Sequence, residues 1–542
     1  MKKFSKILSF ALSLMLVVSI CGACGEKEET AVQSDNKYTY WVSLDSRSAE
    51  TVSSYSELVL YQKVSEATGI DVEFLHPAQG TTGSEAFQIL LSAGDYPDIM
   101  EYSWGSYVGG PDQAIKDGVI IALNDYLEEH APNYYAAMEG TSRLGKLHDY
   151  KASALSVEGN YYGFKSLNVS NYGGYGGIYI RKDMLDKFGL EVPVTIDDWD
   201  NVFKVAKENG VKYPLTGGSG LFTYDTVQAF NNAWGIGKGL YHVDGKVKFG
   251  PFEAAYKDYI GKMAEWMKAG YIDIDFITNG SDNLMASMTN GTSIATMGYV
   301  GSGMGKLLPA MEERDPNYSV VACPFPILNE GDTSWFQEVQ SPAADPCAAI
   351  SVQCGIDDEN RYFGAMKWID YLYSEEGVAL KDFGIEGETY TIEVGSDGEE
   401  HFRYTDVIYD HEKIGAHSVQ AALYHFFRPA GAPGFSEHPD YLDGFYPYEE
   451  QKEAILIWNE NVDNARRRIL PTLSYTGDEA TRRANILSVG RDNLNAGILD
   501  IVLGKKDISE FDAVIEAAKK AGYDELIEIT QSAYDRYLEL AK

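Results

Sequence analysis

Residues 177–199, GIYIRKDMLDKFGLEVPVTIDDW, decide the fold class because they hold a strand and two helix signals in one short stretch. The β-favouring run at the start predicts a strand, and Gly189 predicts the end of the helix that follows it. A second helix, over residues 195–210, has Thr195 or Asp197 as its N-cap. Its apolar face repeats at helical spacing: Trp199, Val202, Phe203 and Ala206. A strand followed at once by helices is typical of an α/β protein.

The same alternation of strands and helices extends in both directions from this stretch. Residues 38–44 predict a strand, residues 55–68 a helix and residues 69–78 a second strand, which is a βαβ beginning. A helix over 85–94 and a strand over 96–104 follow, and the chain closes with two helices separated by Gly522. The glycine-rich residues 301–305, GSGMG, predict a flexible turn.

The N-terminus has the chemistry of an export signal. Lys2, Lys3 and Lys6 precede an apolar run over residues 7–20, which is shorter than the roughly 20 residues that span a bilayer. The run leads into Cys21-Gly-Ala-Cys24, for which a redox pair lacks a preceding strand and a zinc pair lacks a second pair of ligands. The stretch resembles a bacterial lipobox, except that Cys21 stands where leucine is usual. We therefore expect a signal peptide over 1–23, a lipid on Cys24 and a polar tether over 24–36.

Composition excludes some partners. Asp and Glu number 81 against 45 Lys and Arg, a formal net charge of −36, so nucleic acid is excluded as a partner. After cleavage before Cys24 the chain keeps Cys323, Cys347 and Cys354, which leaves room for one disulfide that the sequence does not assign.

Signatures of catalysis and of metal binding are missing from the sequence. There is no H-E-x-x-H motif and no G-x-S-x-G motif, and carboxylate pairs carry no information in so acidic a chain. We therefore expect no catalytic residue, no cofactor and no metal site.

Aromatic residues in loops are the more informative feature. The chain has 38 Tyr, 22 Phe and 8 Trp, and most of these belong to the core by default. Rings that lie in Gly-, Asn- or Ser-rich segments are suited to stack on sugar rings beside amide and carboxylate groups. They are Trp104, Tyr172, Tyr175, Tyr224, Trp234, Tyr299 and Trp335.

Several segments resemble those of extracellular solute-binding proteins of sugar ABC transporters. They are LSAGDYPDIMEY (91–102), VEGNYYGFKSL (157–167, with Lys165 where proline is frequent), residues 177–199, FGIEGETYTI (383–392) and YDELIEITQSAYDRY (523–537). The 383–392 segment and the C-terminus are similar to one branch of large oligosaccharide-binding lipoproteins, which includes alginate-oligosaccharide binders and relatives of the lipoprotein LplA.

The resemblance implies a type 2 periplasmic-binding-protein fold, α/β, with two discontinuous lobes joined by a hinge. The expected N-terminal lobe is 37–167 and 343–385, the expected C-terminal lobe is 168–342 and 386–542, and the chain crosses near 165–170, 338–343 and 384–392. The implied function is capture of an oligosaccharide between the lobes and its delivery to the permease of an ABC importer, outside a membrane to which the lipid anchors the protein. Some relatives carry a calcium loop after the 195–208 helix, but the corresponding segment here is short and poor in carboxylates.

The position of residues in this fold gives the candidate ligand-binding set. Trp104 follows the end of a strand, where α/β sheets bind ligands, and Asn168, Tyr172 and Tyr175 flank the first crossing. Tyr224, Trp234 and Tyr299 belong to loops of the second lobe, and Glu386 and Tyr390 lie at the third crossing. Trp335 completes the candidate set. Arg428 has two interpretations of equal weight, a partner for the carboxylate of an acidic sugar or a salt bridge to the acidic surface. Two other functions remain open: a surface-anchored glycoside hydrolase or lyase, and a receptor for peptides or another solute on the same fold.

Overall fold

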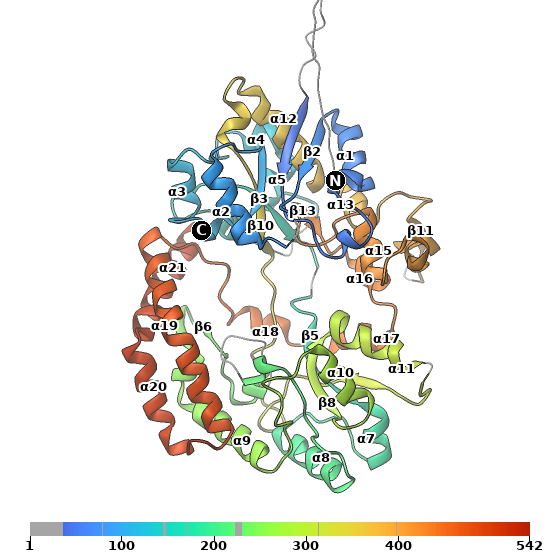
Figure 1. The fold of residues 1–542 in the computed structure, drawn as a ribbon, viewed down its shortest axis with the longest axis vertical. Coiled ribbons are helices and arrows are strands. Elements are labelled where there is room, and N and C mark those ends of the chain that lie inside the picture. Colours follow the sequence, from blue (N-terminus) through green and yellow to red (C-terminus); the bar gives the residue numbers. More distant parts are fainter. Residues whose placement is uncertain are drawn as a thin grey trace, which may run out of the picture. The chain divides into compact units, whose positions relative to one another are not determined.

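The computed structural model describes residues 36–78, 80–144, 148–170, 172–222, 230–312, 314–396 and 398–541. The predicted signal peptide, Cys24 and nearly all of the tether therefore lie outside the described residues, as does Tyr224. From Lys37 onward the chain forms one compact unit of mixed α/β structure (Figure 1).

A six-stranded sheet organises the first part of this unit. Its strands are β1 (Lys37–Trp41), β2 (Asp71–Leu75), β3 (Ile99–Tyr102), β4 (Phe164–Asn168), β10 (Ala343–Ile350) and β13 (Gly434–Ser436). The order is β13-β4-β10-β3-β1-β2, and β10 runs antiparallel to both of its neighbours while the other pairs are parallel. The carboxyl ends of β1, β2, β3, β4 and β13 therefore meet at one edge, where β10 begins.

Helices cover both faces of this sheet. On one face Trp41, Phe87 and Trp104 form a core with α2 (Gly83–Ala93) and α3 (Gly110–Lys116). On the other face Tyr40, Phe74 and Trp368 belong to a larger core with α1 (Val59–Thr68), α12 (Asn360–Asp370) and α13 (Glu375–Asp382). The central strand β3 is accordingly buried along most of its length, whereas the edge strand β2 alternates exposed and buried residues.

A three-stranded sheet organises the second part and contains the stretch on which the fold class was predicted. Its order is β8-β5-β9, with β8 (Ala295–Tyr299) and β9 (Val320–Ala322) both antiparallel to the fully buried β5 (Gly176–Arg181). The predicted helices follow as α7 (Lys182–Phe188), which ends at Gly189 in the left-handed conformation, and α8 (Ile196–Glu208). Thr195 is the N-cap of α8, and the predicted apolar face of α8 is buried.

Three C-terminal helices complete the second core. They are α19 (Gly477–Val502), α20 (Phe511–Lys520) and α21 (Tyr523–Leu540), which lie side by side in Figure 1. α19 packs on α9 (Ala254–Lys268), and α21 packs on β7 (Lys246–Phe249), which pairs with β6 (Leu240–Val243). Ile486, Leu494 and Ile498 of α19 share a core with Trp199 and Trp266, so the C-terminus is an integral part of this region.

The glycine-rich residues predicted as a flexible turn differ in the structure, where they form a π-helical turn, η7 (Val300–Met304), followed by α11 (Gly305–Glu312). The turn is held from outside, because the Gln451 side-chain amide donates to the Val300 carbonyl oxygen at 2.7 Å. A Cβ at Gly305 would lie 2.9 Å from Gln451 Nε2, so the missing side chain permits this contact.

The chain passes between the two sheets more than once. It leaves β4 for β5 through residues 169–175 and returns from β9 to β10 through residues 323–342. β13 then pairs with β4 in the six-stranded sheet, although it comes from the 386–542 segment. After α16 (Pro439–Phe445) the chain enters α17 (Glu449–Asn459), which packs on β5 and β9.

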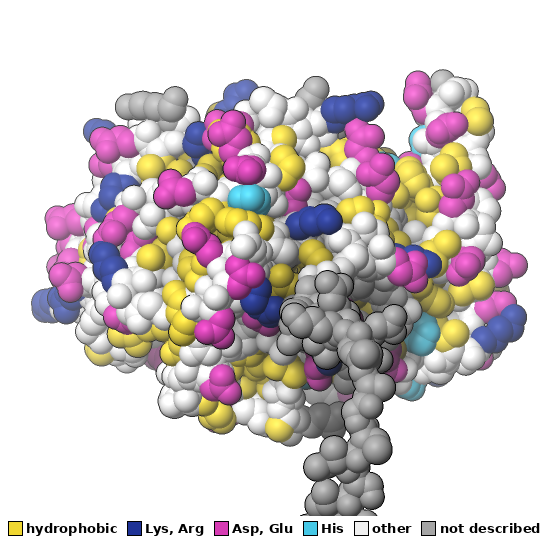
Figure 2. All heavy atoms as spheres, turned by 90° about the horizontal axis from the view of Figure 1, so that it is seen from above, with side chains coloured by type: hydrophobic (Ala, Val, Ile, Leu, Met, Phe, Trp, Pro, Cys, Tyr) yellow, Lys and Arg dark blue, Asp and Glu magenta, His cyan; other side chains and the backbone are white. Residues whose placement is uncertain are grey.

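The other elements connect these parts. They are α4 (Leu127–His130), α5 (Pro132–Met138), α6 (Lys151–Ala154), α10 (Ser281–Thr289), the hairpin of β11 (Tyr390–Val394) and β12 (Glu400–Tyr404), α14 (Asp406–Tyr409), α15 (Val419–Phe426) and α18 (Val462–Arg466). Asp and Glu side chains are scattered over the face seen in Figure 2, with Lys and Arg among them.

Candidate ligand-binding site

A cavity of about 450 Å³ opens at the carboxyl edge of the six-stranded sheet. The loop after β1 forms part of its lining with Ser43, Asp45 and Arg47, and the end of β3 contributes Glu101 and Ser103. The remaining lining residues are Val42, Leu44, Tyr55, Tyr102, Pro346, Tyr424, Arg428, Ala430 and Gly431. In open α/β sheets the carboxyl ends of the strands are where ligands bind.

A second cavity of about 700 Å³ adjoins the first and shares Ser43 and Leu44 with it. It extends over residues 49–53 and over the loop after β2, which begins with His76. Glu57 also lines it and accepts hydrogen bonds from Ser53 and Ser54, which hold its pKa below the ordinary value. The two cavities therefore adjoin at the sheet edge, and their lining mixes polar and apolar side chains.

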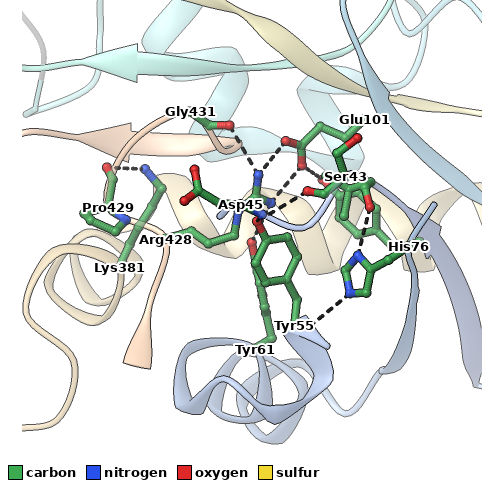
Figure 3. A network of polar contacts seen from close by, with 12 residues as sticks. Ser43, Asp45, Tyr55, Tyr61, His76, Glu101, Lys381, Arg428, Pro429 and Gly431 are labelled. Carbon is green, nitrogen blue, oxygen red and sulfur yellow. Dashed lines mark hydrogen bonds and ion pairs between the residues drawn. The ribbon is translucent and has the colours of Figure 1, made fainter. Parts of the chain in front are cut away.

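Arg428 and Glu101, which both line the first cavity, form a buried ion pair that Figure 3 shows. Arg428 Nη1 donates to Glu101 Oε2 at 3.0 Å and to the Tyr61 hydroxyl at 3.1 Å. Its Nη2 donates to Glu101 Oε1 at 2.7 Å and to the Gly431 carbonyl at 3.3 Å. Burial opposes the charge on Arg428, but the attraction of Glu101 raises the pKa of the guanidinium well above its usual value. Tyr55 lies under the guanidinium, with the ring centroid 4.4 Å from Cζ.

A second ion pair lies at the rim of the same cavity. Arg47 Nε and Nη2 donate to the two Asp45 carboxylate oxygens, each at 2.9 Å, and the Arg47 backbone N–H donates to Oδ1 at 2.8 Å. Burial works against ionisation of Asp45, yet these bonds lower its pKa. Arg47 Cζ lies 3.7 Å from the centroid of the Tyr424 ring, so the guanidinium stacks on one face of that ring.

His76 joins the β1 and β2 loops as a neutral ring. Its Nε2 accepts from the Tyr55 backbone N–H at 3.1 Å, so its Nδ1 carries the proton and donates to the Val42 carbonyl at 2.8 Å. Burial lowers the pKa of His76, and nearby Arg428 lowers it further. The imidazole therefore fixes the loop positions without adding charge to the site.

Another polar cluster lies at the same edge around Glu437, directly after β13. Asn168 Nδ2 and the Tyr175 hydroxyl both donate to Glu437 Oε2, at 2.7 and 2.5 Å. Burial raises the pKa of Glu437, which these bonds partly offset. Glu437 has a φ of 61°, a left-handed conformation that a side chain rarely adopts and that is often found at functional sites. Asn168 and Tyr175, both predicted to flank the first crossing, thus share Glu437 as a hydrogen-bond partner.

The other predicted site residues occupy different surroundings. Trp104, in the short helix η3 (Trp104–Ser106), is fully buried and packs edge-on against Phe87. Tyr172 is half-buried beside the first crossing, and Trp234 is half-buried against Tyr259. Glu386 is exposed and Tyr390 is buried at the start of β11.

Tyr299 and Trp335 lie on the second sheet's side of the crossings and are partly accessible. Tyr299 is 40% exposed at the end of β8, and its hydroxyl donates to Glu338 Oε1 at 3.1 Å. The Trp335 ring is covered on one face by the Arg468 guanidinium at 4.1 Å, and its backbone N–H donates to Asn232 at 3.0 Å. Trp335 is therefore held in a fixed position with a partly open ring.

The sequence departure at Lys165 has a structural explanation. Its side chain is buried and donates to Asp345 Oδ1 at 2.7 Å, at the beginning of β10. Cys323, Cys347 and Cys354 are all buried free thiols, so no disulfide joins them. Burial raises the pKa of each thiol.

Within the described part of the chain, no helix combines the length and the hydrophobicity needed to cross a bilayer. In the same residues, His, Cys, Asp and Glu side chains do not gather in threes that could hold a metal ion.

The candidates predicted from the sequence do not include Glu101, Asp45, Arg47 and Ser43, which line the first cavity. They also do not include Glu437, the acceptor in the neighbouring cluster. Ser43 lies at the end of the strand predicted over residues 38–44, and Asp45 and Arg47 come just after it, which is a signal that could have found them. Glu101 lies inside a strand and Glu437 follows a strand of only three residues, and neither has a comparable signal.

Comparison with known proteins places the chain among solute receptors. FusA of Streptococcus pneumoniae serotype 4, a fructooligosaccharide ABC transporter substrate-binding protein, is 26% identical over 300 residues, which are 50% of this chain and 53% of FusA. That alignment spans about half the length of the relative. The lipoprotein LipO of Bacillus subtilis is 20% identical over 548 residues, covering 96% of this chain and 97% of LipO.

Solved structures support the fold. An HMO-binding, ABC-transporter-associated solute-binding protein from Bifidobacterium longum infantis superposes with a TM-score of 0.70 at 18% identity, covering 92% of this chain and 99% of that one. This confirms the predicted α/β fold of a periplasmic-binding protein. The family model described as bacterial extracellular solute-binding protein matches residues 48–379, more than half of the chain. The chain therefore belongs to the family of bacterial extracellular solute-binding proteins, which are receptors and not enzymes.

Proposed function

We propose that this protein captures an oligosaccharide between two lobes and delivers it to the permease of an ABC importer. The observation that carries the proposal is the pair of adjoining cavities at the carboxyl edge of the six-stranded sheet. Their lining combines hydroxyl, carboxylate and guanidinium groups with tyrosine rings, which is the mixture that sugar hydroxyls and sugar ring faces require. The sugar-binding name of FusA supports the ligand class.

We propose that the lobes follow the two sheets. In this proposal the first crossing is 169–175 and the second is 323–342, the segments that connect the two sheets. Because β13 pairs with β4 and α17 packs on β5, the third crossing in this proposal lies between α16 and α17, later than 384–392. Motion about these three segments would close the lobes on the ligand, and the closed form would be the one that the permease recognises.

The proposed ligand-contacting residues come from both sides of the crossings. On the first side Ser43, Asp45 and Arg47 line the cavity, and Asn168 and Tyr175 form the cluster with Glu437. On the second side Tyr299 and Trp335 are the accessible aromatic residues. The sequence-based set adds Trp104, Tyr172, Tyr224, Trp234, Glu386, Tyr390 and Arg428, which remain proposals. Trp104, Tyr175, Tyr390 and Arg428 are buried, so their proposed part is to support the surface that contacts the ligand.

We propose that Cys24 carries a lipid that anchors the protein to the outer face of the cell membrane. The order of the N-terminal residues, basic then apolar then small, supports export and lipidation. LipO, which is similar over nearly the whole chain, is itself named a lipoprotein.

A thermal-shift screen tests the function. The full chain would be heated with fructan, glucan, xylan, mannan and galactan oligosaccharides, and with a set of short peptides as the matched control. A ligand that binds only the folded state raises the melting temperature by mass action. At least one oligosaccharide should raise it in a concentration-dependent manner. A rise with peptides and with no oligosaccharide would refute the proposal and favour a peptide receptor.

A further inference from the structure

The charges that face the two adjoining cavities are already balanced by the protein itself. The cations among the lining residues described are Arg47 and Arg428, and each faces its own carboxylate, Asp45 and Glu101. Glu57 adds one further carboxylate at the edge of the second cavity. Each positively charged side chain of the described lining is therefore paired with a carboxylate, and the lining carries a slight excess of negative charge.

The guanidinium N–H groups of Arg428 are already engaged by the protein. Each terminal nitrogen of a guanidinium carries two N–H groups. Nη1 gives its two to Glu101 and Tyr61, and Nη2 gives its two to Glu101 and the Gly431 carbonyl. The remaining Nε–H is buried and has no hydrogen-bond acceptor, so it is not presented to a ligand. Of the two interpretations of Arg428 from sequence, the geometry favours a salt bridge, although its partner is a buried carboxylate and not the surface.

A ligand carboxylate placed on this lining would lose its water without gaining a free cation. Such a group is costly to bury unless it is paired and hydrogen-bonded. Glu57, the lining carboxylate that no cation balances, would also repel it, within a chain whose formal net charge is −36. Neutral hydroxyl groups face no such cost, because they can donate to the carboxylates and accept from Arg47 and the serines.

We infer that this subsite takes an uncharged sugar and rejects one that carries a carboxylate. The inference rests on the proposed function and narrows its ligand class to neutral oligosaccharides at the six-stranded sheet. The selectivity comes from the two internal ion pairs, which remove from the cavity the guanidinium groups that a uronic acid would need.

Matched sugars test the inference. Isothermal titration calorimetry of the full chain would compare β-1,4-mannotriose with β-1,4-trimannuronate, and the other neutral oligosaccharides with their C6-oxidised counterparts. We expect at least one neutral sugar to bind and its acidic counterpart to bind at least tenfold more weakly. An acidic sugar that binds as tightly as its neutral counterpart, or more tightly, would overturn the inference while leaving the proposed function intact. If no sugar binds, both this inference and the proposed function are refuted.

Variants of the two ion pairs test the cause. Glu101→Gln leaves Arg428 with a neutral partner, and the affinity ratio should shift at least threefold toward the acidic sugar. Asp45→Asn should shift the affinity ratio in the same direction, because it leaves Arg47 without its carboxylate partner. The Arg47 side chain is 41% exposed, so this variant keeps the inference testable if Glu101→Gln fails to fold. The control is Glu66→Gln, which removes the carboxylate of the exposed Lys63–Glu66 pair outside both cavities and should leave the ratio unchanged. Equal ratios in Asp45→Asn and in the control would contradict the inference.

Discussion

Asp370 is a carboxyl group enclosed at the end of α12. Its oxygens accept from the Tyr134 backbone N–H at 2.8 Å and from Asn133 Nδ2 at 2.8 Å. Burial raises the pKa of Asp370 to about 6, although the hydrogen bonds act in the opposite direction. The carboxylate therefore joins α12 to the start of α5 at a cost that depends on pH.

The first prediction follows from that pKa. Because the folded-state value is above the unfolded one, the penalty for burying the charge is present above pH 6 and is relieved as pH falls from 7 toward 4. Relative to Asp370→Asn, the free energy of unfolding of the unmodified protein should rise over this range by about 2–3 kcal/mol. Urea denaturation at pH 7, 6 and 4.5 measures the difference. A constant difference between the two proteins would contradict the assigned pKa.

Gly434 is the residue whose missing side chain allows β13 to join the sheet. Its φ is 112°, and a Cβ would lie 2.8 Å from both the Leu372 carbonyl oxygen and the Leu372 Cβ. The close backbone approach explains why only glycine fits this position.

The second prediction is that Gly434→Ala destabilises the protein by about 2–4 kcal/mol, from backbone strain and overpacking together. Gly415→Ala is the control, because Gly415 also has a positive φ of 79° but no atom within 4 Å of an added Cβ. The control should cost only about 1 kcal/mol. Thermal and urea unfolding of both variants would show whether the close contact matters; equal losses would argue that it does not.

At the scale of single elements, α8 shows why local signals predict well. The Thr195 side chain accepts from the Asp198 N–H at 3.2 Å, and the Asp198 carboxylate accepts from the Thr195 N–H at 2.8 Å. This reciprocal capping box involves residues three positions apart, so the sequence contains all of it.

The third prediction is that Thr195→Ala lowers the free energy of unfolding by about 1 kcal/mol, because one backbone N–H of the first turn loses its acceptor. Thr195→Ser keeps the hydroxyl oxygen and should recover most of the loss. Urea denaturation at neutral pH distinguishes the two. Equal effects of alanine and serine would assign the loss to the methyl group instead of the cap.

Elements that depend on distant partners could not be predicted in the same way. The π-helical turn at 300–304 is fixed by Gln451, and β13 is fixed by its pairing with β4, some 270 positions away in the chain. Neither partner can be recognised from the local pattern of glycines or from a three-residue strand. The α/β class and the helix ends were therefore predictable, whereas the sheet order was not.

At the scale of the whole molecule, the candidate site also depends on contacts between residues that lie far apart in the sequence. Arg428 was a candidate, but its partner Glu101 lies 327 residues earlier, and only the fold brings them together. Trp104 follows a strand end as predicted, yet its ring turns into the core beside Phe87. Asn168 and Tyr175 were predicted for one region and do share a partner, Glu437, because both flank the first crossing.

The fourth prediction concerns the anchor. Replacing Cys24 by alanine removes the thiol that the lipid would modify, so the protein should move from the membrane fraction to the medium or the soluble fraction while its ligand binding stays unchanged. Cys21→Ala is the control, because Cys21 belongs to the predicted signal peptide and should be dispensable for anchoring. Fractionation followed by immunoblotting measures the distribution. A Cys24→Ala protein that stays with the membrane would refute lipidation at this residue.

Calorimetric titration with neutral oligosaccharides tests most directly whether the chain is an oligosaccharide receptor. We expect saturable binding of at least one neutral oligosaccharide with one ligand per chain. We also expect at least tenfold weaker binding when Asp45 and Arg47 are both replaced by alanine, since these side chains line the cavity at the sheet edge. Saturable binding of a peptide together with no heat from any oligosaccharide would contradict this function.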